Sequence, residues 1–179
     1  MQRRFLIFSC LFLAAAFAVA DQTWVLENST LTYHASHPLH TSEGVSHAAK
    51  GKGVCSGGDC QFLIAVPVKT FDSGDSNRDL HMIQATRGAE FPMVTVRTHF
   101  PESALSSPSL QLDLEIEFAG KTAQYKQVPF QVSTQANEAK LTGTIPARLS
   151  DFQIEAPSLL TVPIKNDIPV RVEMTWKKM

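Results

Sequence analysis

Histidines are the side chains of this chain with the widest chemical range. Six are present, and four of them follow one another closely, namely His34, His37, His40 and His47. A neutral imidazole binds metal ions, and its protonation changes near neutral pH. The four residues could therefore serve a metal-dependent enzyme.

The spacing of these histidines argues against that site. Successive side chains of a strand point to opposite faces, which separates His34 from His37, and His40 falls in a predicted turn. No acidic residue accompanies them in a zinc-enzyme pattern such as His-Glu-x-x-His. We predict polar, hydrogen-bonded histidines with no metal and no catalytic residue, and keep the metal-dependent enzyme as an alternative.

Residues 71–92 read FDSGDSNRDLHMIQATRGAEFP and form a second polar group. The opening Asp-Ser-Gly-Asp-Ser-Asn run is rich in residues that favour turns. Ser76 or Asn77 could cap a short helix, and Gly88 could end it. The sequence therefore predicts one helix-loop, Ser76–Gly88, in a chain that otherwise has the pattern of strands.

Three charged or titratable residues of this motif, Arg78, Asp79 and His81, allow two interpretations. In the first, Arg78 and Asp79 form a buried ion pair that holds the helix-loop in place, which suits the bidentate guanidinium group. In the second, the same residues border an opening and contact the head group of a ligand. We favour the structural interpretation.

The N-terminal residues are typical of a secretory leader. Arg3 and Arg4 precede an apolar run over residues 5–17, and Ala18-Val19-Ala20 provides small residues for cleavage after Ala20. The apolar run is shorter than the roughly 20 residues that span a bilayer. We therefore expect residues 1–20 to be a signal peptide, residues 21–179 to form a single domain, and no transmembrane segment.

Export implies oxidising conditions, and two cysteines remain after cleavage. Cys55 and Cys60 flank Ser-Gly-Gly-Asp, a composition suited to the tip of a hairpin. We predict a structural disulfide between them, since the spacing is not that of a Cys-x-x-Cys redox pair.

Removal of Arg3 and Arg4 changes the formal net charge from −1 to −3, because residues 1–20 contain no acidic residue. No basic stripe points to a nucleic-acid partner.

Most of the remaining chain alternates apolar and polar side chains, as half-buried strands do. The clearest example is 109–118, where leucines, isoleucine and phenylalanine face one way and polar residues the other. Other predicted strands cover residues 24–37, 61–69, 94–98, 123–134, 141–149 and 168–176, and the polar, small stretch 45–54 is predicted as an edge-like strand. The stretch Asp151–Ile164 breaks the pattern and is predicted as a loop with one helical turn. This arrangement indicates an all-β, antiparallel barrel or sandwich of about eight strands.

The central motif FDSGDSNRDLHM, followed by FPMVTV, resembles the YceI-like family of secreted lipid-binding proteins. That family has a turn with Asp-Ser/Thr-Gly, then Asn-x-x-Arg-Asp-x-His, then a proline that opens the next strand. The resemblance extends to residues 31–44, 141–152 and 170–176. It implies a lipocalin-like barrel that holds a long isoprenoid tail, a periplasmic or secreted location, and pairing into a homodimer.

The resemblance also assigns a role to the apolar strand faces. The predicted lining of the binding cavity is Leu31, Tyr33, His37, Phe62, Ile64, Val66, Leu112, Leu114, Ile116, Phe118, Phe130, Leu141, Ile145, Val170, Val172 and Met174. Small inward residues, Ala35, Gly143 and Ala147, would leave room for a guest. Because the inner faces of 109–118 and 168–176 carry no charge, polar head groups are expected at the mouth.

The leading hypothesis is an exported, non-enzymatic carrier of a polyprenyl or quinone-type lipid, with no cofactor. Its alternatives are the metal-dependent enzyme and a fully packed β-module that acts through a protein partner. Apolar strand faces ordinarily pack on one another, so a solid core would favour the packed module.

Overall fold

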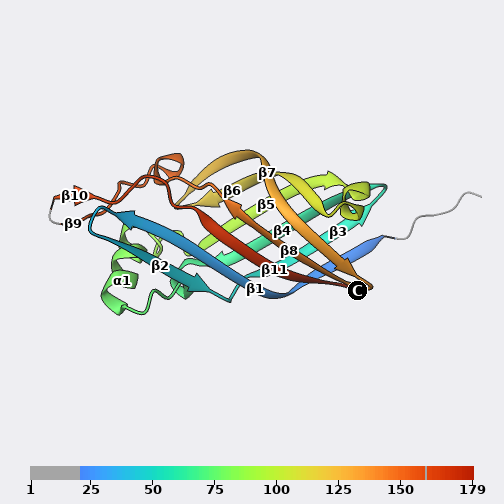
Figure 1. Ribbon diagram of the computed structural model, residues 1–179, viewed down its shortest axis with the longest axis horizontal. Helices are drawn as coiled ribbons and strands as arrows, with labels where there is room; N and C mark the ends of the chain where they lie inside the picture. The colour runs from blue at the N-terminus through green and yellow to red at the C-terminus, as the bar shows by residue number, and fades with distance from the viewer. Residues whose placement is uncertain (1–20, 160) are drawn as a thin grey trace, which may run out of the picture.

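Antiparallel strands close into an elongated barrel in the computed structural model, which describes residues 21–159 and 161–179 (Figure 1). The predicted leader lies outside the described residues. The strands are β1 Gln22–His37, β2 His40–Ser46, β3 Lys50–Ser56, β4 Asp59–Pro67, β5 Met93–Pro101, β6 Ser109–Phe118, β7 Lys121–Gln135, β8 Glu138–Ile145, β9 Ser158–Leu159, β10 Val162–Pro163 and β11 Val170–Lys178. The helices are α1 Ser76–Ala85 and three short 3-10 segments, Val68–Thr70, Glu102–Ser106 and Leu149–Phe152.

Eight strands form the closed wall, in the order β1, β3, β4, β5, β6, β7, β8 and β11, and β11 pairs with β1 to complete it. The first part of β1, residues 22–25, pairs with β3, whereas its last part, residues 31–37, pairs with β2. The predicted barrel is confirmed. The predicted strand over 45–54 is wrong, since β2 ends at Ser46 and β3 begins at Lys50.

Two bulges interrupt the alternation along the wall. One lies in β1, where the pairing with β11 shifts between Leu26 and Asn28. The other lies in β7 opposite Asp113, where Gln127 has a φ of 53°. The Asp113 carboxylate accepts the backbone N–H of Gln127 at 2.9 Å and the ammonium group of Lys126 at 3.0 Å. Each bulge moves the following residues to the other face of the strand.

The two ends of the barrel differ (Figure 1). The end that carries α1 and the β9–β10 hairpin is called the helix end below. The opposite end carries the β3–β4 turn and the 3-10 segment that follows β5, and is called the disulfide end. Cys55 and Cys60 face each other in the β3–β4 hairpin with a Cα–Cα distance of 4.0 Å and form the predicted disulfide.

The N-cap of helix α1 lies one residue before the predicted caps. Asp75, rather than Ser76 or Asn77, is the N-cap, and its carboxylate accepts the backbone N–H groups of Asn77 and Arg78. These two N–H groups lower the pKa of Asp75. At the other end, Arg87 rather than Gly88 adopts the left-handed conformation, with a φ of 53°. At both ends of the helix, a residue adjacent to the predicted one therefore takes the predicted role.

The connection from β8 to β11 is more ordered than predicted. Its helical turn spans Leu149–Phe152 and so begins before Asp151, and the short hairpin of β9 and β10 follows it. Backbone hydrogen bonds from Lys165 to Ser36, and from His34 to Pro169, fasten this connection to β1. The connection therefore belongs to the helix end of the barrel.

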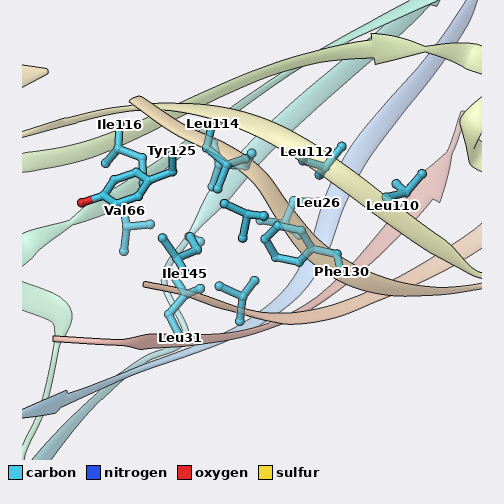
Figure 2. Packing of buried hydrophobic residues seen from close by; sticks show 14 of the residues in the cluster. Leu26, Leu31, Val66, Leu110, Leu112, Leu114, Ile116, Tyr125, Phe130 and Ile145 are labelled. Atoms are coloured by element: carbon cyan, nitrogen blue, oxygen red, sulfur yellow. The ribbon is translucent and has the colours of Figure 1, made fainter. Parts of the chain in front are cut away.

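Apolar side chains point inward from strands around the whole wall (Figure 2). Leu110, Leu112, Leu114 and Ile116 extend along one face of β6, as the alternation predicts. Aromatic residues are among the buried side chains of this cluster, including Trp24, Phe100, Phe130 and Trp176 at 3–8% exposure. The wall is therefore lined by hydrocarbon and aromatic surface along its length.

Candidate functional site

The barrel encloses an apolar cavity of about 560 Å³. This volume is within the usual range for sites that bind small molecules, roughly 300–1,000 Å³. Strand residues from every wall strand except β3 contribute to its lining. Side chains from α1 and from the β8–β11 connection line it at the helix end.

The cavity brings together all the predicted lining residues except His37. His37 is buried at the end of β1, where its Nε2 lies 3.2 Å from the carbonyl oxygen of Val162 and its Nδ1 accepts the backbone N–H of Leu39. It therefore secures the β1–β2 turn and the β9–β10 hairpin rather than the cavity wall. The strand alternation gave its face correctly but could not show that the β9–β10 hairpin covers it.

Further residues line the cavity beyond that predicted lining, and two of them, Ala35 and Ala147, were predicted to point inward as small residues. These further residues are Trp24, Ala35, His40, Ser42, Val68, Phe71, Met82, Ala85, Thr86, Val94, Val96, Thr98, Phe100, Leu105, Leu110, Val132, Ala139, Ala147, Leu149, Phe152, Ile154, Pro157, Ser158, Ile164, Ile168 and Trp176, with Asp75, Asn77 and Arg148 at the rim. The missed positions Met82 and Ala85 of α1 give a signal, because together with Arg78 and His81 they recur with helical spacing on the side that faces the cavity. Trp24 has no such signal, because the β1 bulge reverses the alternation between it and Leu31.

Glycines in the wall help to keep the cavity open. Four inward aromatic rings each lie over a glycine of another strand, where a Cβ atom would overlap the ring. The pairs are Tyr33 over Gly44, Trp176 over Gly51, Phe62 over Gly53 and Phe130 over Gly143. A ring that rests on a glycine lies closer to the wall than one held off by a side chain. Gly143, predicted to leave room for a guest, instead leaves room for the ring of Phe130.

The helix end presents a polar rim. Arg78 and Asp79 do not form the predicted ion pair; both bind Ser73 instead. The Arg78 guanidinium donates to the Ser73 hydroxyl at 2.9 Å and to its carbonyl oxygen at 2.7 Å, and Asp79 accepts the Ser73 hydroxyl at 2.6 Å. Arg78 and His81 line the cavity, whereas Asp79 does not. The motif thus both fixes the loop before α1 and contributes to the rim.

A second polar cluster lies beside the rim. The Tyr125 hydroxyl donates to the Asp151 carboxylate at 2.7 Å, and the Arg148 guanidinium approaches the same carboxylate at 3.0 Å. Burial, together with the hydrogen bond to Asp151, raises the pKa of Tyr125 above its ordinary value. Tyr33, on the cavity wall, also has a raised pKa, because of its burial and the nearby charge of Asp79.

The histidines proposed for a metal site are spread over separate contacts. His34 pairs with Glu43 at 2.8 Å, and His47 lies 3.1 Å from both the Thr30 hydroxyl and the Ser29 carbonyl oxygen. Only His37 and His40 are neighbours, with ring centroids 5.2 Å apart. Among the residues that the structure describes, no group of three or more His, Cys, Asp or Glu side chains is placed to hold a metal ion.

The disulfide end of the cavity is aromatic. The ring of Phe62 stacks on Phe100 with centroids 5.5 Å apart, and it meets Trp176 edge-on at 4.9 Å. Trp24 completes this group, and all four residues line the cavity. The cavity therefore has a polar rim at the helix end and an aromatic chamber at the disulfide end.

Comparisons with known proteins agree on one family. The sequence model of the YceI-like domain matches residues 24–176. No curated protein matches the chain. Within the described residues, no helix has both the length and the apolar character to cross a membrane.

Solved structures share the fold at low sequence identity. A polyisoprenoid-binding domain from Saccharophagus degradans, implicated in plant cell wall breakdown, has a TM-score of 0.71 at 14% identity over 87% of this chain and 98% of its own. BcnA from Burkholderia cenocepacia gives 0.67 at 14% identity, over 82% of this chain and 95% of its own. The YCEI protein of Campylobacter jejuni gives 0.52 at 10% identity, over 98% and 97%. At these identities the structural similarity establishes the fold alone.

Proposed function

The chain belongs to the YceI-like family, and from that membership we propose that it binds one long-chain, isoprenoid-like lipid in its barrel cavity and carries it outside the cytoplasm. The lipid is of the polyprenyl or quinone type, and the protein acts as a carrier rather than an enzyme. The similar domain from Saccharophagus degradans is described as polyisoprenoid-binding, which supports this class of ligand.

The observation that carries the proposal is the unfilled apolar interior of about 560 Å³. Protein interiors are normally close-packed, with few voids larger than a water molecule. Each CH₂ group that enters such a space from water contributes about 0.8 kcal/mol. A long hydrocarbon chain can thus offset the roughly 4–15 kcal/mol that association costs.

The same cavity disfavours a packed β-module that acts only through a protein partner. A module of that kind would fill its interior with its own side chains. Here, rings that could project inward lie over glycines, and small side chains such as Ala35 and Ala147 face the lumen. The predicted lining residues other than His37 are proposed to contact the lipid chain along its length.

A metal-dependent enzyme is the weaker alternative. His34 is engaged by Glu43, and His47 by Thr30 and Ser29, so the four histidines do not converge on one point. Measurement of metal content after purification without chelators checks this alternative, and a stoichiometric metal would revive it.

Export rests on the leader pattern of residues 1–20 and agrees with the Cys55–Cys60 disulfide, since such bonds persist in oxidising compartments. Fractionation of the producing cells, with N-terminal sequencing of the mature chain, tests cleavage after Ala20. The homodimer implied by the resemblance remains a prediction that light scattering on the purified protein checks.

Native mass spectrometry of the purified protein, followed by analysis of its organic extract, tests the main proposal. We expect one lipid of prenyl type per chain. Delipidated protein should then rebind a polyprenyl alcohol or a prenylquinone in a fluorescence titration. A protein that carries no lipid and rebinds neither compound would refute the proposal.

A further inference from the structure

Two polar atoms in the aromatic chamber have no hydrogen-bond partner among the described residues. They are Nε1 of Trp24 and Oγ1 of Thr98, and both are inaccessible to solvent. Trp24 is only 4% exposed, and both residues line the cavity. Buried polar groups in proteins are nearly always hydrogen-bonded, so this pair of atoms calls for a partner.

The two residues lie at one level of the barrel. Strand pairing places Trp24 opposite Gly53, Gly53 opposite Phe62, and Phe62 opposite Thr98. Paired residues point to the same face, so Trp24, Phe62 and Thr98 face the lumen side by side. Between Trp24 and Thr98, the ring of Phe62 lies over Gly53, where a Cβ atom would overlap it.

The side chains around Trp24 and Thr98 determine which kind of chemical group could bind between them. An indole N–H can only donate a hydrogen bond, whereas a threonine hydroxyl can donate or accept. Aromatic rings favour a flat guest that can stack or meet them edge-on. None of the charged lining residues, Asp75, Arg78 and Arg148, lies on a strand that forms this chamber. A charged group is therefore disfavoured here, and a neutral ring that bears oxygen acceptors is favoured.

We propose that the chamber at the disulfide end is the head-group subsite and that it binds a neutral, carbonyl-bearing ring of the quinone type. One ring oxygen accepts the N–H of Trp24, and another oxygen accepts the hydroxyl of Thr98. The prenyl chain then extends along the lumen toward the helix end. This inference rests on the proposed function, and it reverses the expectation that head groups sit at the mouth.

The rim supports this orientation, because its charged groups already have protein partners. Arg78 donates to Ser73, Arg148 pairs with Asp151, and Asp75 caps α1. A head group at the rim would have to compete with these contacts. At the level of Trp24 and Thr98, by contrast, the ligand supplies the missing partners.

Indole N–H signals in a nitrogen-15 NMR spectrum test the proposal on the intact protein, since the chain has only two tryptophans. The delipidated protein is titrated with a prenylquinone and, separately, with the prenyl hydrocarbon of the same chain length. The variant Trp24→Phe lacks one of the two indole N–H signals and so identifies which signal belongs to Trp24. We expect the Trp24 signal to move downfield with the quinone and to show no such downfield shift with the hydrocarbon.

Affinities of matched variants provide the second measurement. Trp24→Phe and Thr98→Val should each weaken quinone binding by roughly two- to tenfold more than they weaken hydrocarbon binding, as expected for the loss of one neutral hydrogen bond. Thr98→Ser, which keeps the hydroxyl, should bind the quinone as the wild type does. Trp176→Phe makes the same change of ring in the same cluster and should affect both probes alike.

The outcomes separate the two proposals. If the wild type binds both probes but neither variant distinguishes them, and the Trp24 signal responds equally to both, the head-group subsite is wrong and the carrier function stands. If the wild type binds neither probe, the carrier function fails and the subsite fails with it.

Discussion

Individual glycines determine how much of this barrel is empty. At four positions an aromatic ring occupies the space where a Cβ atom would be, and each ring therefore lies along the wall. Gly53 is the simplest of these positions, because the three nearest atoms that an added Cβ would meet all belong to the ring of Phe62. At such a position, the absence of a side chain on the glycine lets the ring lie against the wall and so increases the space available to a ligand.

Gly53→Ala should push the ring of Phe62 into the lumen. We expect a loss of about 1–3 kcal/mol in the free energy of unfolding, typical of overpacking, together with weaker lipid binding. Urea denaturation and lipid titration measure the two effects. The double variant Gly53→Ala with Phe62→Leu should recover much of both losses, and an absence of recovery would show that the glycine is needed for another reason.

Tyr125 gives a residue-scale prediction that depends on pH. Its hydroxyl binds the Asp151 carboxylate at 2.7 Å, so Tyr125→Phe should lower the free energy of unfolding by about 1–2 kcal/mol at pH 7. The raised pKa of Tyr125 means that the folded state favours the neutral phenol. Its contribution is complete below the unfolded pKa of about 10 and is lost as the pH rises through the folded pKa.

Urea denaturation of the wild type and of Tyr125→Phe at pH 7 and above pH 10 checks this prediction. The difference between the two proteins should narrow at the higher pH. A constant difference would show that the hydroxyl does not titrate with folding.

At the scale of elements, α1 is the part of the cavity wall that depends most on local chemistry. One face of the helix, which includes Met82 and Ala85, lines the cavity, yet none of its residues is fully buried except at its C-cap, Thr86. Its N-terminus is held by the carboxylate of Asp75. Elements with little buried surface open more readily than the strands around them.

Asp75→Ala should therefore loosen α1 and accelerate release of the bound lipid, with little effect on the strands. Hydrogen-exchange protection of residues 76–85 and the lipid dissociation rate measure the effect. The pKa of Asp75 is lowered in the fold, so its capping contribution is present above the unfolded value of 3.8 and is lost as the pH falls through the folded value.

Asp75→Asn is the matched control, because asparagine also caps helices but does not titrate. Between pH 6 and pH 3 the protection factors of α1 should fall further in the wild type than in Asp75→Asn. Equal falls in the two proteins would assign the acid sensitivity to another carboxylate.

At the scale of the whole molecule, the function requires a continuous lumen. The wall is closed by the pairing of β11 with β1, so an added side chain on the inner face has no route outward. The same substitution on the outer face meets solvent instead. Paired substitutions on the two faces thus separate an effect on ligand binding in the lumen from an effect on the stability of the fold.

Val96→Phe places a ring in the cavity, whereas Val25→Phe places the same ring on the outer face, where Val25 is 38% exposed. We expect Val96→Phe to weaken lipid binding by at least about tenfold, the equivalent of 1.4 kcal/mol. Val25→Phe should bind as the wild type does. Circular dichroism and lipid titration measure both, and equal binding by both variants would contradict a lumen-bound lipid.

The sequence alone determined the features that depend on neighbours along the chain. Alternation in 109–118 identified the inward face of β6, and the turn residues before Arg78 located the helix-loop. The spacing of Cys55 and Cys60 identified the disulfide hairpin. These features follow from strand periodicity, turn preference and chain proximity, which a local segment already contains.

Only the tertiary structure decided which residues share the lumen and whether it stays empty. The bulges near Leu26 and Gln127 reverse the alternation, so Trp24 and Tyr125 face inward against the local pattern. The rings of Phe62 and Phe130 lie on glycines of neighbouring strands, a contact that no single segment encodes. Bulges and ring positions depend on the register between strands distant in the sequence, and that register is fixed only when the barrel closes.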